Sequence, residues 1–275
     1  MDLTRSHLER LSAMITRHSG LVFTEARWPF LRNQAREVMA KEGFTCGSRW
    51  TDEVEASAGE PGTVYAALEE ALQIHETSFF RYERHHRVLE EIVIPEMVRN
   101  RMAEGEPRIR IWSVGCSTGE EPYSIAMTVS ESMQNRASCP VEIVAVDTSR
   151  KELALASQGT YSPASAASIP RGYLAKYFDQ GPEGYTIVPM LKEMVRFLHY
   201  DIRAGLYVGK FDLIFCCNVL LYFTTVVRRQ ILIRLAESLR RGGFLFLGHA
   251  DGITPPAEMF ESRHLLPAAF VYRRI

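Results

Sequence analysis

The chain has 275 residues, 46% of them hydrophobic, so it can bury the core of one large or two modest domains. Lysine and arginine number 32 and aspartate and glutamate 33, so the net charge of −1 gives no global attraction to nucleic acid or an anionic membrane. There is neither a secretory signal nor an uninterrupted apolar run of about 18 residues, which predicts a cytoplasmic protein without direct membrane insertion.

The N-terminal region, residues 1–81, has apolar residues at helical spacing and glycine-rich breaks, which predicts a small all-helical domain. An amphipathic helix over 82–103 follows, inside a predicted linker over 82–107. From Arg108 onward, strand patterns alternate with helical ones up to residue 275. This alternation is typical of an α/β domain with a parallel, doubly wound sheet.

One connection of this second domain, about 160–194, is too long for a simple crossover. Its tail, YFDQGPEGYTIV, has a Gly/Pro turn between β-forming residues and predicts a hairpin, so we expect a small inserted antiparallel β subdomain.

The cysteines form no CxxC pair, which gives no indication of a zinc site or a disulfide framework. We expect reduced thiols and no metal. The cysteines are Cys46, Cys116, Cys139, Cys216 and Cys217.

Polar and small residues follow successive predicted strands. In an open α/β sheet the ligand lies beyond the carboxyl ends of the strands. The first strand runs into the small-residue turn Gly115–Gly119, which lacks both the full G-x-G-x-x-G pattern and the Gly-Lys-Ser/Thr of a P-loop. Asp147, Asp201 and Asn218 follow later strands. Each can be a turn or helix cap, but together they favour an adenosine ligand without a required pyrophosphate site.

The stretch SVGCSTGEEPYSIAM, with FFR upstream and FDLIFCCNVLLYF and GGFLFLGHAD downstream, resembles the CheR-type chemotaxis receptor methyltransferases over nearly the whole chain. The resemblance implies a Rossmann-like methyltransferase domain over 108–275 with S-adenosylmethionine as cofactor and S-adenosylhomocysteine as product. It also implies a protein-glutamate O-methyltransferase, which esterifies glutamates of the cytoplasmic domain of methyl-accepting chemoreceptors in chemotaxis signal transduction.

The resemblance further implies cofactor contacts. Glu121 would hold the amino group of the methionine moiety, Asp147 the ribose, and Asp201 with Ile202 the adenine edge. His75 stands where the family has Asn, and Asp201 where it often has Asn. The full implied set is His75, Thr77, Arg81, Gly115, Ser117, Gly119, Glu121, Asp147, Asp201, Ile202, Asn218 and Val219.

Two residues are predicted to act in methyl transfer. Arg81 would orient the substrate carboxylate through its planar guanidinium, with a solvated helix charge as the alternative. Tyr222 would place its hydroxyl or ring beside the sulfonium, with simple packing as the alternative. Because a glutamate carboxylate is already ionised near neutral pH, no general base is needed.

Receptor binding is expected on a basic helix, whose cations are Arg27, Arg32, Arg36 and Lys41. Glu25, Glu37 and Glu42 dilute this face, and a merely solvated helix is the alternative. The short turn DQGPEG indicates a member that acts without a receptor C-terminal tethering peptide. Two rivals stay open. One is a methyltransferase for nucleic acid or small molecules, although its Asp/Asn-Pro-Pro-aromatic and Pro-Cys motifs are absent. The other is a non-catalytic cofactor-binding sensor or interaction module.

Overall fold

In a computed structural model of the chain, the structure describes residues 3–133, 139–205, 209–267 and 269–275. The chain divides into two compact units. Unit 1 contains Met1–Ile74 and Tyr222–Arg228, and unit 2 contains His75–Leu221 and Arg229–Ile275.

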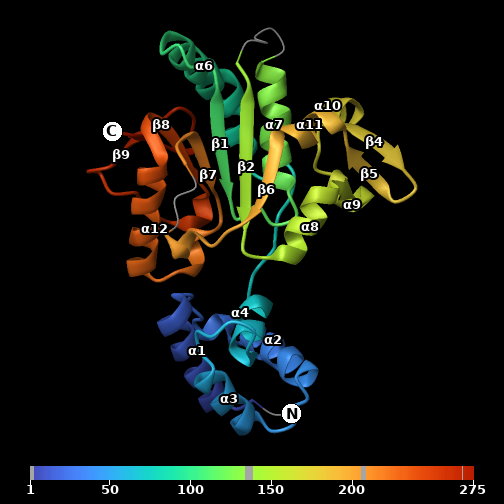
Figure 1. Ribbon diagram of the computed structural model, residues 1–275, viewed down its shortest axis with the longest axis vertical. Coiled ribbons are helices and arrows are strands. Elements are labelled where there is room, and N and C mark those ends of the chain that lie inside the picture. Colours follow the sequence, from blue (N-terminus) through green and yellow to red (C-terminus); the bar gives the residue numbers. More distant parts are fainter. Residues whose placement is uncertain (1–2, 134–138, 206–208, 268) are drawn as a thin grey trace. The chain divides into compact units, whose positions relative to one another are not determined.

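Unit 1 is helical, as predicted (Figure 1). Its core is built by apolar side chains that recur at helical spacing, among them Leu11, Trp50 and Leu68, each with no exposed surface. Its helices are α1 (Arg5–Ser19), the 3₁₀ turn η1 (Glu25–Arg27), α2 (Trp28–Lys41), α3 (Gly47–Ala56) and α4 (Val64–Ala71).

A distant stretch of sequence also belongs to unit 1. Leu21 and Phe223 form an antiparallel bridge, the Val22 amide donates to the Tyr222 carbonyl at 2.8 Å, and the Thr224 amide donates to the Gly20 carbonyl at 2.8 Å. These bonds attach residues 222–228 to the end of α1.

The segment predicted as one helix over 82–103 consists of α5 (Glu83–Val88), the π-helical turn η2 (Leu89–Val93) and α6 (Ile94–Ala103). Pro95 explains the interruption, because proline has no N–H to donate to the carbonyl one turn before. The Ile94 amide instead donates to the Leu89 carbonyl, five residues back.

Unit 2 contains the predicted doubly wound sheet, with strand order β6-β2-β1-β7-β8-β10-β9 (Figure 1). The pairs from β6 through β8 are parallel, and β10 is antiparallel to both neighbours. The strands are β1 (Ile109–Val114), β2 (Val141–Asp147), β6 (Val195–His199), β7 (Phe211–Cys216), β8 (Leu239–Leu247), β9 (Phe260–Arg263) and β10 (Phe270–Arg274).

Side chains alternate across the sheet and bury both faces. Ile111 and Ile143 belong to a core cluster that includes residues of α6 and α7, whereas Trp112 stacks on Phe211 with ring centroids 5.1 Å apart. The remaining helices are α7 (Glu120–Ser132), α8 (Arg150–Gln158), α9 (Pro163–Ala166), α10 (Arg171–Tyr177), α11 (Pro189–Met194) and α12 (Thr225–Ser238). The 3₁₀ turns are η3 (Ile202–Ala204), η4 (Leu220–Tyr222) and η5 (His249–Asp251).

The predicted β subdomain is confirmed as a three-stranded antiparallel sheet in the order β3-β5-β4. The expected hairpin is formed by β4 (Phe178–Gly181) and β5 (Gly184–Ile187), and β3 (Thr160–Tyr161) pairs with the other edge of β5. The Tyr161 hydroxyl donates to the Thr118 carbonyl at 2.8 Å, so the subdomain supports the turn that follows β1.

Candidate active site

The predicted cofactor residues between Gly115 and Val219 follow the carboxyl ends of parallel strands and therefore lie along one edge of the sheet (Figure 1). Gly115–Glu121 follows β1 at the centre, Asp147 ends β2, and Asp201 follows β6. Asn218 and Val219 follow β7 on the other side of β1.

The turn after β1 has a backbone that only small residues tolerate. Gly115 has φ 74°, and a Cβ there would lie 2.6 Å from Val219 Cγ2. Gly119 has φ 94°, and a Cβ there would lie 3.0 Å from both the Ala156 Cβ and the Tyr161 hydroxyl. The turn therefore keeps its backbone open at the start of α7, where amides and the helix N-terminus can approach a ligand.

Asp147 holds this turn in place. Its Oδ2 accepts from the Ser117 amide at 2.8 Å, and its Oδ1 accepts from the Ser149 amide at 2.9 Å. The alternative role of helix N-cap falls to Ser149, whose side chain accepts from the Glu152 amide at the start of α8, so Asp147 stabilises the turns on either side and not the helix end. Each carboxylate oxygen can accept a further hydrogen bond, so binding of the ribose hydroxyls stays a prediction.

Glu121 is different, because its carboxylate is enclosed by protein and yet retains partial solvent exposure. Burial raises its pKa to about 7, and the nearby Asp251 charge acts in the same direction. The hydrogen bond from Ser113 Oγ, at 2.7 Å, and the positive charge of Arg81 oppose that rise. Within the described residues no ion pair neutralises Glu121. An enclosed carboxylate of this kind fits the ammonium group of the methionine moiety.

Arg81 lies in a turn whose backbone is unusual. Phe80, the preceding residue, has φ 51°, which is rare for a bulky side chain. Arg81 Nη1 donates to the Glu76 carbonyl at 2.6 Å, and Nη2 lies 3.6 Å from Glu76 Oε1. About a third of the Arg81 side chain is exposed to solvent. Its positive charge also acts to lower the pKa of Glu121.

The segment that precedes Phe80 lies against the Gly115–Gly119 turn after β1. Ser117, with φ 48°, donates from Oγ to the His75 carbonyl at 3.2 Å, so the backbone of His75 is placed beside the cofactor turn. His75 and Thr77 are both partly exposed.

At the end of β6, Asp201 is bound by a neighbour. Its Oδ1 accepts from the Arg203 amide at 2.7 Å, and its Oδ2 accepts from Arg203 Nη2 at 2.6 Å. Ile202 is buried. The turn-forming role left open from the sequence is present here too, and the adenine contact stays a prediction.

The sequence predicts no role for Asp251, which ends the 3₁₀ turn η5 that comes shortly after β8. It is buried, and its carboxylate accepts from the amides of Asn218, Leu220, Leu221 and Gly248. These bonds hold Asn218 at φ 62°, where its Oδ1 accepts from the Tyr82 hydroxyl at 2.6 Å. The missed signal was an acidic residue in the short turn that follows a buried strand.

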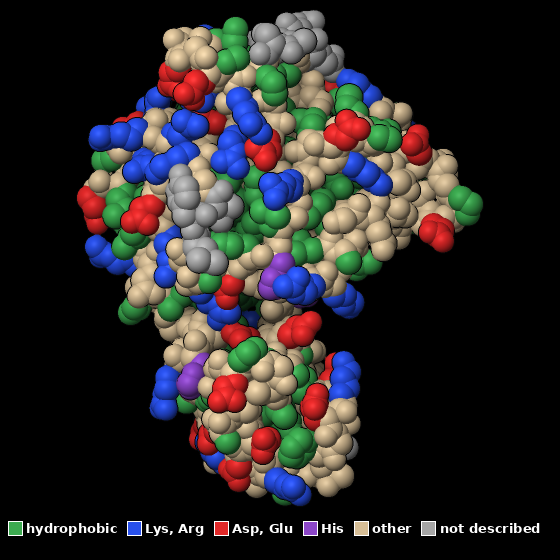
Figure 2. Space-filling model, viewed as in Figure 1, with side chains coloured by type: hydrophobic (Ala, Val, Ile, Leu, Met, Phe, Trp, Pro, Cys, Tyr) green, Lys and Arg blue, Asp and Glu red, His purple; other side chains and the backbone are tan. Residues whose placement is uncertain are grey.

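Tyr222 belongs to unit 1, where the guanidinium carbon of Arg27 lies 5.1 Å from its ring centroid. Arg27 Nη1 also donates to the Val22 carbonyl at 3.0 Å, and burial lowers the pKa of Arg27. Arg27 is therefore half-buried against Tyr222. Arg32 is half-buried as well, whereas Arg36 and Lys41 are exposed on α2. Figure 2 shows acidic and basic side chains interspersed over one face of this unit.

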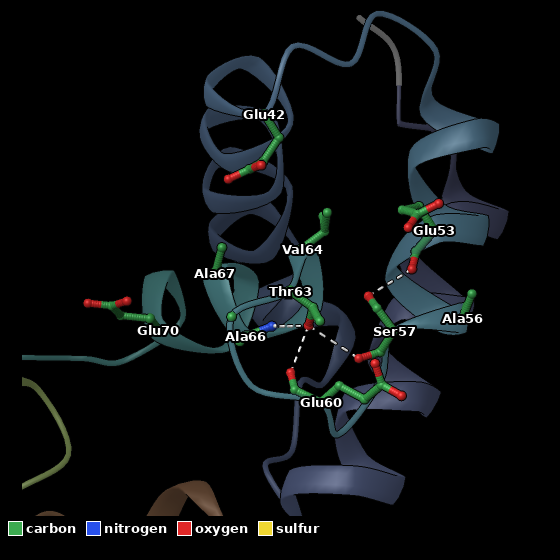
Figure 3. A pocket seen from close by; sticks show the side chains of 11 residues that line it. Glu42, Glu53, Ala56, Ser57, Glu60, Thr63, Val64, Ala66, Ala67 and Glu70 are labelled. Carbon is green, nitrogen blue, oxygen red and sulfur yellow. Dashed lines mark hydrogen bonds between the residues drawn. The ribbon is translucent and has the colours of Figure 1, made fainter.

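Unit 1 also has a hollow of about 630 Å³ lined by Glu42, Glu53, Glu60 and Glu70 (Figure 3). Its polar floor is satisfied internally, since the Thr63 hydroxyl donates to the Glu60 carbonyl at 2.8 Å and accepts from the Ala66 amide. The hollow would repel an acidic partner and contains none of the predicted site residues.

Over the described ranges, no cluster of His, Cys, Asp and Glu side chains is arranged to hold a metal ion. None of the helices in those ranges is both long and apolar enough to cross a bilayer. The cysteines there are all free, and burial raises the pKa of the Cys216 and Cys217 thiols well above the usual value, so neither is a ready thiolate nucleophile.

Comparison with known proteins gives the family. Residues 75–266 match the family model described as CheR methyltransferase, SAM binding domain. The chain is 32% identical to chemotaxis protein methyltransferase Cher2 of Pseudomonas putida, over 89% of this chain and 90% of that one. It is 29% identical to chemotaxis protein methyltransferase 1 of Pseudomonas aeruginosa, over 99% of both.

Among solved structures, the N-methyltransferase NodS from Bradyrhizobium japonicum WM9 covers 70% of this chain and 94% of its own, with a TM-score of 0.39 and 14% identity. This likeness is too low to carry an argument. The family match over most of unit 2, together with the enclosed carboxylate and open glycine turn at the β1 end, leads to one conclusion. The chain belongs to the CheR methyltransferase family and is an S-adenosylmethionine-dependent methyltransferase.

Proposed function

We propose that this protein methylates glutamate side chains on the cytoplasmic helices of chemoreceptors and gives glutamate methyl esters. The names of the relatives support a chemotaxis role. The observation that carries the choice of a carboxylate substrate is Arg81, a partly exposed cation whose charge reaches Glu121 at the cofactor end of the sheet. A guanidinium there can bind a carboxylate through two parallel hydrogen bonds.

When bound, S-adenosylmethionine supplies a methyl group on a positively charged sulfur and leaves as S-adenosylhomocysteine. The Glu121 carboxylate would hold its ammonium group, and the Gly115–Gly119 turn would let the backbone approach it closely. Asp147 fixes the turn through the Ser117 amide. The remaining proposed contacts, from His75, Thr77, Asp201, Ile202, Asn218 and Val219, rest on the resemblance.

Arg81 would orient one oxygen of the substrate carboxylate toward the methyl carbon. A glutamate has a reference pKa of about 4.3 and needs no base, so the residues act by alignment and exclusion of water. Binding by Arg81 must be moderate, because interactions equally strong in the ground state do not raise turnover. The role of Tyr222 rests on the sequence, and Tyr222→Phe separates hydroxyl chemistry, which is lost, from ring packing, which is retained.

Receptor recognition would use the exposed cations of α2, Arg36 and Lys41, with the receptor's methylation helices as the acidic partner. Arg27 is already engaged with Tyr222. The β4–β5 turn is short, and we propose that it works without a tethering peptide and that the protein acts in the cytoplasm. A micromolar affinity for a receptor C-terminal peptide would contradict the first of these points.

The test is transfer of labelled methyl from S-adenosylmethionine to purified chemoreceptor cytoplasmic fragments, measured as methanol released by base. Methyl esters hydrolyse in base and methylated amines do not. We expect base-labile label on glutamate and a loss of about 100-fold in turnover for Arg81→Ala, with cofactor affinity within about threefold of wild type.

Arg87→Ala is the matched control, because Arg87 is an exposed arginine of α5 that pairs with Glu91. It should retain turnover. Cofactor binding without label on any receptor fragment would reject the proposed function, and equal turnover in Arg81→Ala and wild type would remove Arg81 from the mechanism.

A further inference from the structure

The turn that presents Arg81 contains a strained backbone. Phe80 has φ 51°, and a bulky residue in the left-handed region costs free energy and persists only where its surroundings fix it. Its ring packs edge-on against His86 and Tyr173, with centroids 4.9 and 5.1 Å away. Ring packing alone does not fix the peptide plane between Phe79 and Phe80, on the N-terminal side of the strained residue, so a bond to the backbone is needed.

That bond comes from Ser124. The Phe80 amide donates to Ser124 Oγ at 3.0 Å, and Ser124 is fully buried. The hydroxyl itself donates to the Glu120 carbonyl at 2.6 Å. Because the hydroxyl hydrogen is directed to Glu120, an oxygen lone pair is left to face the Phe80 amide. The Phe80 amide is therefore the donor and Ser124 Oγ the acceptor of this hydrogen bond.

Helix stability does not explain a serine at this place. A serine hydroxyl that bonds to the carbonyl four residues back slightly weakens a helix, and alanine has the better helix propensity. Ser124 lies one turn after Glu121 on α7. The same rigid helix thus carries the carboxylate beside the cofactor turn and the anchor of the turn before Arg81.

We propose that Ser124 is a positioning residue for Arg81. By accepting the Phe80 amide, it holds the left-handed turn that sets where the Arg81 guanidinium lies relative to Glu121. The inference rests on the proposed role of Arg81 in methyl transfer. It assigns Ser124 no contact with cofactor or receptor.

The first measurement is amide hydrogen exchange of residues 79–82 in the cofactor-free protein, which needs no activity. Ser124→Ala should speed exchange of the Phe80 amide about tenfold, the effect of losing one net hydrogen bond. Ser130→Ala is the matched control, since Ser130 Oγ donates to the Ala126 carbonyl on the same helix. It should leave this exchange unchanged. Unchanged exchange in Ser124→Ala would overturn the inference, whatever the substrate of the enzyme proves to be.

The second measurement is a double-mutant cycle on receptor methylation. Ser124→Ala should lower kcat about tenfold while the calorimetric Kd for S-adenosylmethionine stays within about twofold. In the Arg81→Ala background it should cause no further loss, because its effect acts through Arg81. Equal losses in both backgrounds would assign Ser124 a general structural role and overturn the proposal. Ser124→Thr keeps the hydroxyl and should restore both the slow exchange and the turnover.

Discussion

At the end of β6, the Asp201 carboxylate accepts hydrogen bonds from the amide and the guanidinium of Arg203, whereas at the end of β1 the Glu121 carboxylate accepts from the Ser113 hydroxyl. Both lie at the same edge of one sheet. Asp201 has its cation two residues away in the chain. Glu121 is enclosed, has a pKa raised to about 7 by burial, and forms no ion pair within the described residues.

The difference separates a carboxylate that shapes a turn from one that stays available to a cationic ligand. A charge paired within the chain gains little from a second cation. An enclosed charge without a pair stays costly to ionise until a cation arrives, so it can select an ammonium-bearing ligand. The contrast predicts that the same change, acid to amide, has a large effect on cofactor affinity at Glu121 and a small one at Asp201.

Glu121→Gln should give the largest effect on the cofactor. We expect the Kd for S-adenosylmethionine to rise about 10- to 100-fold, because a hydrogen bond between charged groups is worth about 1.5–3 kcal/mol. The change keeps the shape of the side chain and removes its charge. Isothermal titration calorimetry measures it directly.

Glu131→Gln supplies the control for charge. Glu131 lies near the end of the same helix and accepts from Lys176 Nζ at 2.8 Å and the Tyr177 hydroxyl at 2.7 Å, away from the turn. The Kd of Glu131→Gln for S-adenosylmethionine should match that of the wild type. Equal affinity in Glu121→Gln and wild type would show that Glu121 does not hold the ammonium group.

The effect of pH on cofactor affinity should be smaller than that of Glu121→Gln, and it should arise from the Glu121 carboxylate. With its pKa raised to about 7, Glu121 is mostly protonated at pH 6 and mostly ionised at pH 7.5, so affinity should fall about eightfold from pH 7.5 to pH 6. In the cofactor-free protein the protonated form is favoured. This group's contribution to the free energy of unfolding is therefore present below about pH 4.5 and lost as the pH rises through about 7.

The cofactor should accordingly raise the Tm more at pH 7.5 than at pH 6. Calorimetry and thermal unfolding at both values check the two trends, and Glu121→Gln should remove the pH dependence of affinity. A Kd that is constant over this range in the wild type would mean that another group neutralises the ammonium.

Much of the fold was predictable, because strand and helix periods alternate clearly from Arg108 onward and DQGPEG is a plain hairpin turn. The π-helical turn before Pro95 and the two-residue strand Thr160–Tyr161 were not, since neither changes hydrophobic periodicity. The attachment of residues 222–228 to unit 1 depends on backbone bonds to Gly20 and Val22, which no local pattern encodes.

The positions of Asp147 and Glu121 near strand ends were predictable, because the strand and helix patterns indicate where β1 and β2 end. The candidate site was not predictable where a side chain accepts a hydrogen bond from a backbone amide far away in the sequence. Ser124 and Asp251 bind the backbones of Phe80 and Asn218, and a left-handed conformation at a residue other than glycine has no signature in composition.

The smallest effect should come from Asp201→Asn. An asparagine oxygen can still accept from the Arg203 amide, and a half-exposed ion pair is worth about 0–1 kcal/mol, so the Tm should change by no more than a few degrees. The Kd for S-adenosylmethionine should stay within about threefold of wild type, because the carboxylate charge is already matched by Arg203. A tenfold change in Kd would mean that the Asp201 charge itself acts on adenosine, and the contrast between the ends of β1 and β6 would then be one of degree.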